Sequence, residues 1–262
     1  MLSRVAAWVN DPVSTTAAKG AILDSSVATL ALTAVAQDTP EREIEVLKAI
    51  QEARYAGGKD VTSPDVVAAL PHARVIAASD TIAAINVNVA KKIETWSPQL
   101  ADNGPKSVDD VVIPTAFDGP SLTVDGRTIE IVAAEDMINR RYLWVPDLQA
   151  VIGGVLIFSG THVWTADTQT KELRAAWVAN LDALIARAPD AVVPGHMSVD
   201  APVGVDAITF TKSYLEAFEE ELDRAATSEE LIAAMVARYP ELGTGVTREI
   251  GAKVALREMD WG

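Results

Sequence analysis

The sequence contains no cysteine and only three histidines, which are His72, His162 and His196. Without cysteine the chain can form no disulfide, no thiolate zinc site and no iron–sulfur cluster, and it has no cysteine nucleophile. Basic residues are also few, because 22 Lys and Arg stand against 37 Asp and Glu, which gives a formal net charge of −15. We expect no nucleic-acid partner and no binding to anionic membranes, since both need clustered Lys and Arg.

Aromatic residues and long apolar runs are scarce as well. The chain holds 6 Trp, 4 Tyr and 4 Phe, and no stretch approaches the roughly 20 apolar residues that cross a bilayer. The segment Ala21–Gln37 ends in Ala34-Val35-Ala36, which suits a signal-peptidase site, but Asp24 interrupts its apolar part. We therefore expect a cytoplasmic protein, with export as the alternative if this segment is cleaved.

Helix and strand signals are spread along the whole chain. Apolar residues at helical spacing, with capping residues before them, predict helices over residues 40–56, 64–70, 81–96, 170–188, 207–226 and 228–238. Short apolar or alternating runs between turn residues predict strands over residues 73–78, 111–113, 121–124, 128–132, 141–145, 151–158 and 191–193. Two hairpins are expected, one at the Asp125-Gly126 turn and one formed by the strands at 141–145 and 151–158.

We expect these elements to form one compact domain. An apolar content of 49% in 262 residues is enough for a sizeable core. The simplest division is a domain over residues 1–205 and a helical extension over residues 206–262 that packs on the same domain. The sequence has neither a phosphate-binding loop nor a Gly-x-Ser-x-Gly nucleophile elbow, so nucleotide binding and an α/β-hydrolase triad are unsupported.

Two stretches carry more information in their residue order than in the periodic spacing of their apolar residues. In the first, Tyr142–Pro146 leads through Val151–Leu156 to His162-Val163-Trp164-Thr165-Ala166-Asp167. In the second, the helix at 170–188 leads to a strand that ends in Pro194-Gly195-His196. Together they resemble the C-terminal half of a metallo-β-lactamase-fold hydrolase over residues 70–200. The resemblance implies an α/β fold, an αββα sandwich with a helical C-terminal extension, and places His196 where the family has a zinc ligand.

The chain departs from this family at its defining zinc motif, His-x-His-x-Asp-His. The corresponding stretch, Gly57–Leu70, holds no histidine and keeps only Asp65. Glu135 and Asp136 stand where the next histidine ligand would lie, and glycine occupies the position of the bridging aspartate. A catalytic zinc needs about three protein ligands, so the resemblance implies a degenerate site. We expect no bound metal and no cofactor.

Three functions remain open. The first is a metal-independent, hydrolase- or lyase-like enzyme that acts on a small neutral organic molecule by hydrolysis, elimination or cyclisation. His196 would be its acid–base group, with Asp65, Glu135 and Asp136 as the other catalytic candidates. The second is a pseudoenzyme that binds a ligand or oligomerises, for example as a homodimer. The third is a hydrolase with a metal site built from carboxylates and His196.

Each candidate site residue also has a structural alternative. His162 and Trp164 are the predicted substrate-binding residues, because their segment resembles one near the family's pocket, but packing would also account for them. His196 follows a strand, where α/β sheets gather their chemistry, although a purely structural turn is the alternative. Helix capping accounts for Ser63-Pro64-Asp65. The paired acids before the strand at 141–145 also suit solvated loop charges.

Overall fold

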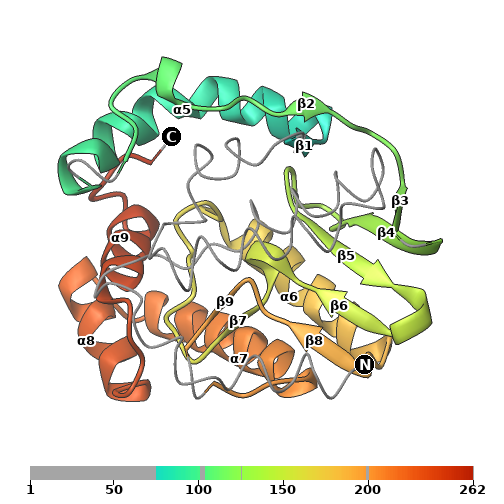
Figure 1. Cartoon of the computed structure of the whole chain (residues 1–262). Helices are drawn as coiled ribbons and strands as arrows, with labels where there is room; N and C mark the ends of the chain where they lie inside the picture. Colours follow the sequence, from blue (N-terminus) through green and yellow to red (C-terminus); the bar gives the residue numbers. More distant parts are fainter. Residues whose placement is uncertain (1–74, 101–103, 125, 199–200, 262) are drawn as a thin grey trace, which may run out of the picture. The chain divides into compact units, whose positions relative to one another are not determined.

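The structure, a computed structural model, describes residues 75–100, 104–124, 126–198 and 201–261 (Figure 1). The chain divides into two compact units, Met1–Arg127 and Thr128–Gly262. The helices expected at 40–56 and 64–70 lie outside the described residues, as do the capping segment that holds Asp65 and the turn residue Asp125. Among the described helices, none combines the length and the apolar character that a membrane span requires.

In the first unit a long helix follows a short strand. Strand β1 (Ile76–Ala77) pairs in parallel with β2 (Thr115–Ala116). Helix α5 (Ser79–Leu100) begins where the Asp118 carboxylate accepts hydrogen bonds from the Ser79 backbone N–H at 2.8 Å and from its hydroxyl at 2.5 Å. This long-range cap explains why the helix begins before the predicted residue 81.

The strand predicted at 111–113 is wrong. Residues 111–113 belong to no strand: a 3-10 helix, η5 (Val108–Asp110), ends just before them, and this segment pairs with β1 at β2. The Asp110 carboxylate accepts hydrogen bonds from the backbone N–H groups of Lys106 at 2.9 Å and Ser107 at 2.8 Å. These local bonds close a turn just before the predicted strand. The next strand, β3 (Ser121–Val124), has the predicted bounds.

The second unit contains a sheet in which β4, β5, β6 and β8 lie side by side in that order (Figure 1). Their bounds are Arg127–Ala133, Arg141–Val145, Ala150–Ile152 and Ala191–Val193. Strand β5 is antiparallel to both β4 and β6, whereas β6 and β8 are parallel. The predicted strands at 141–145 and 191–193 are confirmed with the same bounds, as is the antiparallel pairing of the second hairpin.

The single strand predicted at 151–158 is wrong, because the chain breaks there. Strand β6 gives way to a 3-10 helix, η7 (Gly154–Leu156), and a new strand, β7 (Phe158–Ser159), pairs in parallel with β9 (His196–Met197). Gly154 has a positive φ of 50°, and a Cβ at residue 195 would overlap the Gly154 backbone. Gly154 therefore lets the chain turn, and Gly195 lets the two backbone segments touch. The apolar residues of this stretch do not by themselves indicate such a break.

Helices make up the rest of the second unit. They are α6 (Lys171–Ala186), α7 (Val205–Leu222), α8 (Ser228–Arg238) and α9 (Gly245–Ala255). Helix α8 has the predicted bounds, and α6 and α7 lie within a few residues of theirs. Helix α6 packs on α7, α7 on β7, and α8 on α9. The mixture of these helices with the sheet confirms the α/β class.

Helix α9 is not among the predicted elements. Its sequence contains Gly245 and Gly251, which lower helix propensity. A Cβ at residue 251 would overlap the Thr165 hydroxyl, so the glycine lets the helix approach the segment that follows β7. The helix is therefore stabilised by tertiary packing more than by its local sequence.

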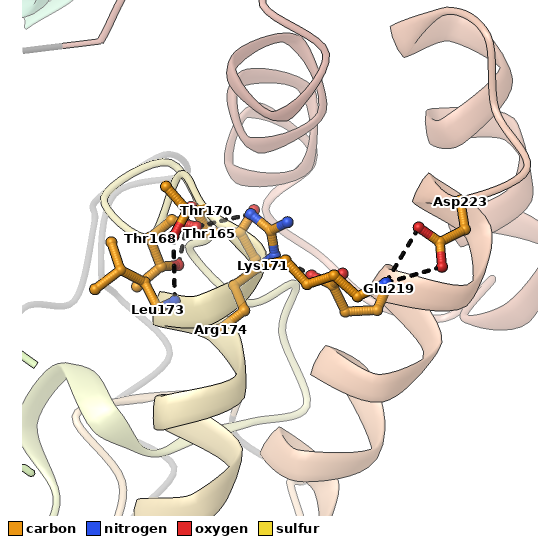
Figure 2. Close-up of polar contacts among 8 residues, drawn as sticks. All are labelled: Thr165, Thr168, Thr170, Lys171, Leu173, Arg174, Glu219 and Asp223. Carbon is orange, nitrogen blue, oxygen red and sulfur yellow. Dashed lines mark hydrogen bonds and ion pairs between the residues drawn. The ribbon is translucent and has the colours of Figure 1, made fainter. Parts of the chain in front are cut away.

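A nearly buried arginine joins α6 to α7. Figure 2 shows Arg174 reaching from α6 to Glu219 on α7, where its Nε donates a hydrogen bond to the carboxylate. Its Nη1 donates to the Thr168 carbonyl at 2.8 Å, and its guanidinium lies 5.7 Å from the centre of the Phe218 ring. Because Arg174 is 3% exposed, loss of Glu219 would leave a buried charge without a partner.

Candidate active site

Three connections of the second unit meet at one end of its sheet. Because β5 runs antiparallel to β4 and β6, the turn between β4 and β5 lies at the end where β6 terminates. Strand β8 ends there too, since it is parallel to β6. In α/β sheets the carboxyl ends of the strands are the usual place for ligand contacts. The predicted residues His196, Glu135 and Asp136 all follow strands that end at this edge.

His196 begins β9 immediately after the turn that follows β8. Its imidazole is partly buried and faces Phe158, the residue opposite it in β7. The two ring centres are 4.6 Å apart and the ring planes differ by 18°, which is a stacked arrangement. The backbone N–H of Gly195 donates to the Ile157 carbonyl at 3.0 Å. Both the backbone and the ring of this turn are therefore held by neighbouring chain.

Glu135 and Asp136 are exposed in the turn between β4 and β5. The side chain of Asn180, on α6, accepts a hydrogen bond from the Glu135 N–H and donates one to its carbonyl, each at 2.9 Å. These two bonds attach the backbone of the turn to α6, but they do not orient the carboxylate of either residue. Asp65 lies outside the described residues. The catalytic roles of these acids stay predictions.

His162 lies in a different setting, between two helices. It is 1% exposed, its Nδ1 is 2.9 Å from the Tyr214 hydroxyl on α7, and its Nε2 is 3.2 Å from Nη1 of Arg248 on α9. An arginine can only donate, so Nε2 accepts the hydrogen bond from Arg248. Nδ1 therefore carries the proton and donates a hydrogen bond to the Tyr214 hydroxyl. Burial, together with the nearby Arg248 charge, lowers the pKa of His162 to about 4. The imidazole is therefore neutral at pH 7.

These contacts favour the packing alternative for His162. Both ring nitrogens are engaged, and the ring meets Tyr214 edge-on at 5.8 Å. Burial also raises the pKa of the Tyr214 hydroxyl, which stays protonated. The cluster joins the segment after β7 to α7 and α9. A direct contact between His162 and a substrate stays a prediction.

Trp164 belongs to an aromatic contact that the sequence did not reveal. Its ring meets that of Trp261 edge-on, with the centres 5.3 Å apart. The Trp261 indole N–H donates to Asp167 at 2.7 Å, and its carbonyl accepts from the Gln169 side chain at 2.8 Å. The other Asp167 oxygen lies 3.3 Å from Arg140, which immediately precedes β5. Arg140 and Trp261 were missed because no local pattern connects residues so far apart in the sequence.

A metal site would need several acidic or histidine side chains close together. In the described ranges, no three His, Asp or Glu side chains come together in a group that could hold a metal ion. A catalytic zinc site needs about three protein ligands. This part of the chain therefore does not by itself provide a zinc site.

No protein-family model and no curated protein matches the sequence. Among solved structures, the chain is similar to the DIM-1 metallo-β-lactamase exposed to ceftazidime, with 18% identity over 55% of this chain and 57% of that one, at a TM-score of 0.34. It is also similar to a metallo-β-lactamase from Pontibacter korlensis, with 19% identity over 47% and 55% of the two chains and a TM-score of 0.28. It is similar as well to TMB-1, with 16% identity over 68% of this chain and 76% of that one, at a TM-score of 0.30. The chain thus spans 57% and 55% of the first two structures.

Proposed function

We propose that this protein is a metal-independent enzyme that acts on a small neutral organic molecule, with His196 as its acid–base group. The observation that carries the proposal is the position of His196. It follows β8 at the carboxyl edge of the sheet, and its ring is only partly buried and stacks on Phe158. Histidine is the side chain used most often for general acid–base catalysis.

One such group is enough for the reactions in question. In hydrolysis of an ester or lactone, an unprotonated nitrogen of His196 takes a proton from water as the water oxygen attacks the carbonyl carbon. The resulting imidazolium returns the proton to the leaving oxygen as the carbon–oxygen bond breaks. In an elimination or cyclisation the same nitrogen takes a proton from the substrate and passes it to the leaving group.

The charge of the chain supports a neutral substrate. Its formal net charge of −15 works against the approach of anions. Glu135 and Asp136 add two exposed acids at the same edge of the sheet as His196. An ester, lactone, thioester or amide without its own negative charge fits this environment better than a phosphate or sulfate ester does.

The test is a panel of uncharged esters, lactones, thioesters and amides assayed with the full chain and with His196→Gln. We expect the wild type to convert at least one compound and the variant to lose that activity by about 100-fold or more, the scale of general acid–base catalysis. His72→Gln is the matched control, because it makes the same change at the histidine that no site prediction uses. Full activity in His196→Gln would overturn the proposal.

A measurement of bound metal distinguishes the metal-dependent alternative from the metal-independent enzyme. Elemental analysis of the purified protein is expected to find no stoichiometric metal, and treatment with a chelator is expected to leave the rate unchanged. Activity that disappears with the chelator and returns only with Zn²⁺, Mn²⁺ or Mg²⁺ would favour the carboxylate and His196 metal site. If no compound is converted and a ligand or a second copy binds instead, the pseudoenzyme alternative is favoured.

A further inference from the structure

We infer that Phe158 is the positioning residue of this site and fixes the plane in which the His196 imidazole lies. The inference rests on the proposed function, because only an acid–base role makes the orientation of this ring important. A proton moves to or from an imidazole nitrogen in the plane of the ring. Whatever sets that plane therefore sets the direction from which a substrate is reached.

Phe158 can act in this way because its own backbone is fixed. Its N–H donates to the Thr211 hydroxyl of α7 at 2.9 Å, and this hydroxyl lies 2.8 Å from the Phe158 carbonyl oxygen. Thr211 is fully buried, so water does not compete for these bonds. Strand β7 is thereby attached to α7 at the residue that carries the aromatic ring.

The ring of Phe158 is enclosed as well. It is 3% exposed and contacts Trp177 of α6, with the ring centres 6.2 Å apart. Trp177 is fixed in turn, because its indole N–H donates to the Leu156 carbonyl at 2.9 Å. Phe158 thus presents a flat face that cannot rotate away, and His196 lies nearly parallel to it.

The backbone next to His196 is held by separate contacts. Gly195 lies against the Gly154 backbone so closely that no Cβ would fit, and β7 and β9 continue in register to Ser159 and Met197. This contact places the Cα of His196, and stacking on Phe158 restricts the rotation of its side chain. A leucine at 158 would fill most of the volume without providing a flat face.

The test compares Phe158→Leu with Phe210→Leu. Phe210 is a matched control, because it is a partly buried aromatic of the same core whose ring contacts are Tyr214 and Tyr239. The imidazole protons of His196 are followed by NMR and assigned with His196→Gln. We expect Phe158→Leu alone to move these signals downfield, since the shielding by the stacked ring is lost. In kinetics we expect a fall in kcat of about 10- to 100-fold with little change in KM.

Two results would overturn the inference. One is that the His196 signals are the same in folded Phe158→Leu and Phe210→Leu. The other is that the signals move but kcat does not, which would mean that the orientation is not used. Phe158→Tyr keeps the flat face and is expected to keep both the signals and kcat. If Phe158→Leu does not fold, Phe158→Met replaces it, because methionine adapts to the space.

The proposed function fails by a different result. Full activity in His196→Gln would remove the acid–base role whatever happens at Phe158. The NMR comparison still reports on the stacking in that case, since it needs no substrate. The two claims are therefore decided by separate measurements.

Discussion

His162 and His196 belong to the same unit but have contrasting surroundings. His162 is enclosed, and both of its ring nitrogens are engaged by Tyr214 and Arg248. His196 is only partly buried, follows a strand at the edge of the sheet, and has one face of its ring against Phe158. The surroundings of an imidazole set what it does. The first of these histidines joins two helices, and the second is the one for which we propose an acid–base role.

The largest expected effect concerns the pH dependence of stability that His162 contributes. Its pKa in the folded protein is about 4, below the ordinary value of 6.5. The unfolded chain therefore binds the proton at a higher pH, and the free energy of unfolding falls as the pH drops from about 6.5 to about 4. At about 1.4 kcal/mol per pKa unit the loss amounts to about 3 kcal/mol.

His162→Gln tests this expectation. Glutamine can accept from Arg248 and donate to Tyr214 but does not titrate. Urea unfolding followed by tryptophan fluorescence at pH 7 and pH 4.5 should show a smaller acid loss in the variant than in the wild type. Carboxylates titrate in both proteins and cancel in the difference. If the free energy of unfolding fell equally with pH in the wild type and in His162→Gln, His162 would not be the source of the acid loss.

The second prediction concerns the turn that carries His196. In Gly195→Ala the new Cβ would overlap the Gly154 backbone, so the chain must shift. We expect a loss of about 2 kcal/mol in the free energy of unfolding, because overpacking of a close contact typically costs 1–3 kcal/mol. Chemical denaturation measures it. Gly243→Ala is the control, since a Cβ at residue 243 would meet no atom within 4 Å. Equal stability of the two variants would show that the Gly154 contact does not hold this turn.

The smallest effect is expected from Arg248→Gln. Burial is the larger cause of the low pKa of His162, and the Arg248 charge is the smaller one. Removing the charge should raise the pKa of His162 by only part of the shift, and so reduce the acid loss by less than half of the about 3 kcal/mol expected for the wild type. The same pH series measures it. An acid loss that disappears altogether would mean that charge, and not burial, keeps His162 neutral.

Local signals in the sequence are enough to locate much of this fold. Capping and apolar spacing depend on residues near one another in the sequence, and they place α8, β5 and β8 with their observed bounds. They also place His196 directly after a strand. The residue types in Pro194-Gly195-His196 are sufficient for that, because a turn after a buried strand is a local property.

Only the tertiary structure decided the rest, because it depended on contacts between distant segments. The break after β6 follows from the approach of Gly195 to Gly154, and α9 follows from the packing of Gly251 on Thr165. The surroundings of the two histidines have the same origin. The partners of His162 lie 52 and 86 residues away in the sequence, and His196 meets Phe158 only because β7 and β9 pair. The sequence by itself determined where the histidines stand along the chain, and folding determined what surrounds each of them.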